Sequence, residues 1–211
     1  MKRMDPVFER TCDLIDGELE NWLQAVLGDI LTSYDRLHLR DPLCTCLLEL
    51  ATNANKANMK HIFFLEKGWD IYDPQLYTER LKEFRDHVLH FESTVAYAEK
   101  AKQAGLYVRV SIHHSPAGLK IAVYNNLPVI PEDEKRIREK FLHALEYQNL
   151  VDFYRDYGDN SEGSGLGFAL MVLMLRSEGI PPSLLRVGTD GGQTAARIEV
   201  PFHPGSAPQS Q

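Results

Sequence analysis

The chain has 211 residues, 44% of them hydrophobic, with a formal net charge of −7 and a pI near 5.6. That length and apolar content can bury one sizeable core with a small helical appendage, while the acidic balance argues against a broad nucleic-acid or anionic-membrane surface. No apolar run could span a bilayer, and MKRMDPVFERTCD lacks the apolar core of a signal peptide. We therefore expect a cytoplasmic protein with reduced cysteines and no nucleic-acid or membrane partner.

The first part of the chain is predicted to be helical. An N-terminal segment, residues 1–40, carries apolar residues at alternating spacings of four and three, typical of a long amphipathic helix: Phe8, Cys12, Ile15, Leu19, Trp22, Val26 and Ile30. Asp41-Pro42 is a helix start signal, and the second helix is expected to run to about Lys60. Asp73-Pro74 repeats the signal before a third, long helix that Gly105 can end.

The pattern then becomes alternating. Two hairpins are predicted, one turning at residues 116–118 and one at Gly191-Gly192. Between them we expect a helix over 131–147, a long polar loop over 148–165 and an apolar helix over 167–178, while the tail 204–211 is predicted to be disordered. Helices combined with antiparallel hairpins indicate an α+β fold, a two-layer α/β sandwich.

The second helix carries more polar groups than its buried face requires. In LLELATNANKANMK, Glu49, Asn53 and Lys56 fall within one sector of the helix. The carboxylate could act as a base, the amide oxygen could ligate magnesium, and the lysine could neutralise phosphate charge. A solvated helix face is the alternative interpretation.

A glycine-rich stretch precedes the apolar helix. Gly163, Gly165 and Gly167 in EGSGLG allow a close backbone approach to an anion, and the start of the following helix offers unpaired N–H donors. The sequence fits a phosphate cradle, and equally a flexible turn before a buried helix.

Taken in order, ELATNANKAN, VYNNLPVIP and EGSGLG resemble the ATP-binding domain shared by histidine kinases, anti-sigma-factor kinases, gyrase-type topoisomerases and the ninety-kilodalton heat-shock chaperone. The resemblance implies a histidine kinase-like ATPase domain over residues 41–203, with extra long N-terminal helices and a helical insertion over 59–105. It also implies ATP and Mg²⁺ as cofactors. The long inserted helix is expected to pack within the chain beside the sheet, with packing on the N-terminal helix, or across a homodimer, as the alternatives.

The resemblance also implies a role for each matching residue. Asn53 would ligate the magnesium ion, Glu49 would act as base or position a water molecule, and Lys56 would approach the phosphates. The residues expected along the nucleotide are Asn125 at the adenine, Gly163, Gly165 and Gly167 at the triphosphate, Thr194 beside the adenine pocket, and 131–162 as a lid.

One motif departs from the family. Where Asp-x-Gly-x-Gly is usual, this chain has Asn125-Asn126-Leu127-Pro128-Val129, so an amide replaces the carboxylate and side chains replace both glycines. An amide oxygen can still accept a hydrogen bond from the adenine amino group. We expect no phosphoacceptor within this sequence and therefore a signalling ATPase or kinase that acts on a separate protein. The altered motif leaves a non-catalytic adaptor as the alternative.

Overall fold

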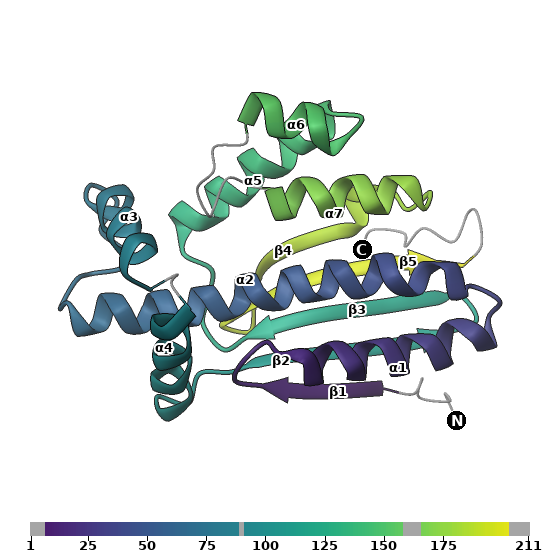
Figure 1. Ribbon diagram of the computed structural model, residues 1–211, viewed down its shortest axis with the longest axis horizontal. Helices are drawn as coiled ribbons and strands as arrows, with labels where there is room; N and C mark the ends of the chain where they lie inside the picture. The colour runs from purple at the N-terminus through teal and green to yellow at the C-terminus, as the bar shows by residue number, and fades with distance from the viewer. Residues whose placement is uncertain (1–6, 89–90, 158–165, 203–211) are drawn as a thin grey trace.

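The computed structural model describes residues 7–88, 91–157 and 166–202, which form a mixed α+β structure (Figure 1). Its helices and strands, in chain order, are β1 (Val7–Cys12), α1 (Gly17–Ser33), α2 (Arg40–Glu66), α3 (Tyr77–Val88), α4 (Phe91–Gln103), β2 (Val108–Ser115), β3 (Gly118–Asn125), α5 (Pro131–Glu146), α6 (Leu150–Tyr157), α7 (Leu166–Ser177), β4 (Leu185–Asp190) and β5 (Gln193–Pro201). Within the described ranges, no helix is both long enough and apolar enough to cross a bilayer.

The strands form an antiparallel five-stranded sheet in the order β1-β2-β3-β5-β4. Alternation along the strands explains the core, because successive side chains point to opposite faces. Ile121 of β3 pairs with Ile112 of β2 and Ile198 of β5, and all three side chains are buried. The inner face of the sheet packs against α1, α2 and α7, which lie side by side over it (Figure 1).

The β2–β3 turn depends on a glycine. Gly118 has a φ of +151°, and a Cβ atom there would overlap the carbonyl oxygen of Val200 and lie 3.0 Å from the Cα of Pro201. Both neighbours are backbone, so they cannot move aside cheaply. Replacing Gly118 with alanine is expected to lower the free energy of unfolding by about 2–4 kcal/mol, measured by urea denaturation.

Gly28 provides the matched control for that substitution. It lies inside α1, and a Cβ atom there would meet only Arg40 Cδ at 3.6 Å, an ordinary van der Waals distance. The Gly28→Ala variant is expected to keep or slightly raise the stability, because alanine is the better helix former. Equal losses in the two variants would contradict the argument for Gly118.

The inserted segment forms a second core at one end of the molecule. Helices α3 and α4 pack on the C-terminal half of α2, which extends past the edge of the sheet (Figure 1). The residues buried in this second core are Met59, Phe63, Phe64, Ile71, Tyr77, Leu81, Phe84, Val88, Ala98 and Ile130. The insertion therefore packs within the chain, as expected, although on α2 and not beside the sheet.

Several predicted elements are confirmed. Both hairpins, the helix from 131 and the apolar helix from about 167 are present. Gly105 and Gly179 follow α4 and α7 with φ values of +74° and +70°, the conformation in which glycine ends helices. The cysteines are free thiols, and burial raises the pKa of Cys46 to about 12.

Other predictions were wrong. Residues 7–12 form an edge strand paired with β2 and not the start of a helix, and α1 begins only after Asp16, whose side chain caps it. Asp41 does not cap α2, which begins one residue earlier and continues to Glu66. The predicted third helix is two helices, α3 and α4, and the predicted loop over 148–165 contains α6. The tail 204–211 lies outside the described residues.

Candidate functional site

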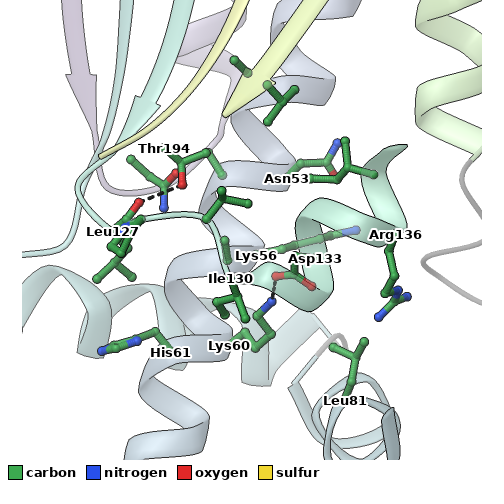
Figure 2. Close-up of a pocket in the computed structure, with 18 of the residues that line it drawn as sticks. Asn53, Lys56, Lys60, His61, Leu81, Leu127, Ile130, Asp133, Arg136 and Thr194 are labelled. Carbon is green, nitrogen blue, oxygen red and sulfur yellow. Dashed lines mark hydrogen bonds and ion pairs between the residues drawn. The ribbon is translucent and has the colours of Figure 1, made fainter. Parts of the chain in front are cut away.

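A cavity of about 250 Å³ lies between α2, the ends of β3 and β5, the segment after β3, and helices α3 and α5 (Figure 2). Asn53 and Lys56 reach it from α2, and Lys56 extends toward α5 (Figure 2). Asn125 and Thr194 reach it from the strands, where they are directly paired in the β3–β5 register. Four of the residues predicted from separate motifs therefore line one cavity.

The remaining predicted residues lie beside this cavity or outside the described ranges. Glu49 is one turn before Asn53 on α2, and its carboxylate packs against Gly167 at the start of α7, so that a Cβ atom on Gly167 would lie 2.9 Å from Glu49 Cδ. The next residue of α7, Phe168, lines the cavity. Gly163 and Gly165 lie outside the described residues.

The amide of Asn125 has a defined orientation. The backbone carbonyl of Tyr107 can only accept a hydrogen bond, so Asn58 donates to it with Nδ2, at 3.2 Å. Asn58 Oδ1 is then left to accept, and Asn125 donates to it with its own Nδ2, also at 3.2 Å. This chain of amides is buried, with Asn125 only 2% exposed. It leaves Asn125 Oδ1 as the acceptor that can face a ligand.

The segment that replaces the glycine motif is fastened to the second hairpin. The backbone N–H and the hydroxyl of Thr194 both donate to the carbonyl oxygen of Leu127, each at 2.7 Å, and the Val129 N–H donates to the hydroxyl of Thr189 at 3.2 Å. The side chains of Leu127 and Val129 line the cavity. The hydroxyl of Thr194 therefore already donates its proton within the protein. Leu127 and Val129, which stand where the family has glycine, form apolar parts of the cavity wall.

The cavity gathers positive charge in an acidic protein. Among its described lining residues, Asp133 is the one acidic side chain, and the basic ones are Lys56, Lys60, His61, Arg85, Arg136 and Lys140. Burial and the neighbouring Lys60 lower the pKa of His61, which favours its neutral form. Besides the Lys60–Asp133 pair, the described lining includes the basic side chains of Lys56, Arg85, Arg136 and Lys140, a composition that suits an anionic ligand.

Beneath the first turn of α5 lies a group of residues that the sequence did not indicate. Lys60 of α2 forms an ion pair with Asp133 of α5 (Figure 2). Lys60 also donates to the hydroxyl of Tyr77 at 2.7 Å, and that hydroxyl donates to Asp133 at 2.6 Å. We call Lys60, Tyr77 and Asp133 the α5 anchor. A lysine within the buried stripe of α2, between Met59 and Phe63, was the available signal.

The oxygen donors of this cavity could hold magnesium only together with a ligand that brings phosphate oxygens. Among the described residues no group of three His, Cys, Asp or Glu side chains is close enough to hold a metal ion. Mg²⁺ is often held by one or two protein oxygens, with the rest supplied by substrate phosphates and water. Asn53 lines a cavity rich in basic residues, with Glu49 one turn away, and therefore fits a magnesium ion that is held mainly by phosphates and water.

Comparison with known proteins gives little functional information. No family model matches the chain. It is 37% identical over 184 residues to an uncharacterized protein of Treponema pallidum (strain Nichols), a match that covers 87% of this chain and 36% of that protein. The chain thus spans about a third of the length of this relative.

Among solved structures, the chain is similar to one in the crystal structure of the SiaB-SiaC complex from Pseudomonas aeruginosa. The TM-score is 0.43 at 12% sequence identity, with 94% of this chain and 90% of that chain covered. A similarity of this strength assigns neither a fold family nor a function.

Proposed function

We propose that this chain is a magnesium-dependent ATP-binding signalling protein of the histidine kinase-like class, which acts on a separate protein partner. The observation that carries the proposal is the meeting of Asn53, Lys56, Asn125 and Thr194 in one cationic cavity. These residues come from three distant stretches of the sequence, each of which resembles the family at the residue in question. If Asn53 and Lys56 only formed a solvated face of α2, they would have no reason to share a cavity with Asn125 and Thr194.

The adenine end of the proposed site is the buried end. Val123, Leu127 and Ala196 supply apolar surface, and Asn125 Oδ1 supplies the acceptor for the adenine amino group. Guanine presents a carbonyl oxygen at the corresponding position, and two acceptors would face each other. The site is therefore proposed to prefer ATP over GTP.

The phosphate end of the proposed site lies toward α5 and α7. Lys56 on one side and Arg136 and Lys140 on the other would neutralise phosphate charge, Asn53 would hold the magnesium ion, and the backbone from Gly163 to Gly167 would approach the triphosphate. When bound there, the metal would supply positive charge that offsets the charge of the phosphates. Glu49, next to Gly167, would accept a proton from an attacking hydroxyl or water.

The second candidate, a non-catalytic adaptor with this fold, has its own supporting observation. Leu127 and Val129 place side chains in the cavity where the family has glycine, and the remaining volume of about 250 Å³ lies just below the roughly 300–1,000 Å³ of most ligand pockets. For ATP to bind with α5 in this position, the triphosphate has to extend through the mouth of the cavity.

Calorimetric titration with ATP, ADP, GTP and a non-hydrolysable ATP analogue, each with and without Mg²⁺, separates the two candidates. Magnesium-dependent binding of ATP with a micromolar Kd, and weaker binding of GTP, is the expected result. An absence of heat for every nucleotide at high protein concentration would reject ATP binding and leave the adaptor.

A further inference from the structure

Tyr77 places a hydroxyl group from the insertion against α5, the helix over the proposed site. It is the first residue of α3 and 2% exposed, and its ring packs near Phe64 of α2, with 5.9 Å between the ring centroids. Lys60 Nζ lies 5.3 Å from the centroid of the same ring. The ring is thus held by the second core, and its hydroxyl is fixed where it meets Asp133.

The inner face of helix α5 is incompletely packed on the sheet. A further cavity of about 160 Å³ lies beneath α5 and shares Val129, Ile137, Phe168 and Val187 with the main cavity. The C-terminal half of α5 packs on α7 through Phe141, Ala144 and Leu145, and the α5 anchor holds its first turn. Unfilled space under a helix lowers the free energy needed to displace it. The position of α5 therefore depends on these two attachments.

The anchor also sets the position of the cationic side chains on α5. Arg136, Ile137 and Lys140 lie three, four and seven residues after Asp133, which places them on the same helix face, and all line the cavity. A shift of Asp133 would therefore carry Arg136 and Lys140 with it.

We propose that Tyr77 is a positioning residue for the proposed nucleotide site: by holding Asp133 together with Lys60, it sets the place of Arg136 and Lys140 over the phosphates. The inference rests on the proposed function. It gives the insertion a role in ligand binding, since Tyr77 belongs to the inserted segment and does not itself line the cavity.

The chemistry of the anchor suits this role. Burial and Asp133 raise the pKa of Tyr77, so its hydroxyl stays protonated and donates to the carboxylate. Burial also pulls the pKa of Lys60 downward, which Asp133 opposes. A hydrogen-bonded charged group held in a defined geometry fixes the orientation of its helix more tightly than apolar contacts of the same size would.

Tyr77→Phe tests the inference, because it removes the hydroxyl and keeps the ring. The matched control is Tyr97→Phe on α4, which loses a hydrogen bond from its hydroxyl to Glu66 at 2.8 Å within the same insertion and has no part in the anchor. Without nucleotide, amide hydrogen exchange over 134–146 is expected to quicken about fivefold to tenfold in Tyr77→Phe, and the ATP affinity to fall by a similar factor. Tyr97→Phe should change neither, and thermal melts show whether both variants fold.

Amide exchange and ATP affinity distinguish a failure of the positioning role from a failure of the proposed function. Unchanged exchange of α5 in Tyr77→Phe would overturn the positioning role, even if the wild-type protein binds ATP. Faster exchange with unchanged ATP affinity would also overturn it, since α5 would then be loosened without consequence for the site. A wild-type protein that binds no ATP would instead reject the proposed function itself, a result visible before any variant is made.

Discussion

Replacing Asn53 with alanine is expected to abolish the magnesium-dependent part of ATP binding. The amide oxygen of Asn53 is the one protein ligand that the proposed site assigns to the metal, and alanine offers no oxygen. The loss of one ligand to a charged group costs about 1.5–3 kcal/mol, which corresponds to roughly 10- to 150-fold in Kd. Titration calorimetry should give the variant the same isotherm in magnesium as in a chelator.

Asn21→Ala is the matched control for that experiment. Asn21 is an exposed residue of α1, outside the cavity, so the same chemical change is made on another helix. It should leave the ATP isotherm unchanged. Equal ATP affinity of wild type and Asn53→Ala in magnesium would sink the assignment of Asn53 and, with it, the ATP-binding proposal.

The elements that the sequence predicted well are those with local signals. Both hairpins combine strict alternation with a turn, and the Gly191-Gly192 turn has both φ values positive, +58° and +82°. The helix at 131 starts at a proline and carries apolar residues on the helical period. The helix at 166 is a continuous apolar run that Gly179 closes. In each of these cases, neighbouring residues alone specify the conformation.

The elements that were mispredicted depend on distant parts of the chain. Phe8 and Cys12 are four residues apart and fit a helical period, yet VFERTC pairs along its whole length with β2, about a hundred residues further on. Asp16, which caps α1, would have marked the true start of that helix. Tertiary pairing outweighed a short periodic pattern at this point.

The sequence motifs predicted the residues of the candidate site but not how they are arranged in space. Spacing alone put Glu49, Asn53 and Lys56 on one helix, and the structure places the last two in the cavity with Asn125 and Thr194. Their roles remain predictions. Tyr77 and Asp133 were out of reach, because a tyrosine at the start of one helix and an acid in the first turn of another carry no sign that they meet. Such contacts exist only once the insertion has folded onto α2.

Asp133→Ala is expected to have the largest effect on stability, about 3–5 kcal/mol at neutral pH, because it leaves the ammonium group of Lys60 buried without its carboxylate. Lys60 is 5% exposed, and burial already lowers its pKa against the opposing effect of Asp133. Without Asp133 that pKa should fall further, while the unfolded chain keeps the ordinary value of about 10.4.

The sign of the pH dependence follows from this difference. Between the two pKa values the unfolded state binds the proton that the folded state has lost, so the free energy of unfolding of Asp133→Ala should rise with pH. The deficit relative to wild type is then largest at low pH and shrinks as Lys60 becomes neutral. Urea denaturation at intervals from about pH 6 to 9.5 measures it.

Glu134→Ala separates the buried pair from an ordinary acid in the same turn of α5. Glu134 is exposed, its ion pair with Arg138 is 3.5 Å long, and its loss should cost less than about 1 kcal/mol at every pH. In a triple variant, Lys60→Met with Tyr77→Phe and Asp133→Leu, apolar groups replace both charges and the buried hydroxyl that bridges them, so most of the lost stability should return and the pH-dependent rise should vanish. A deficit in Asp133→Ala that is equal at all pH values would show that Lys60 is not the group left unpaired, and would remove the electrostatic basis of the α5 anchor.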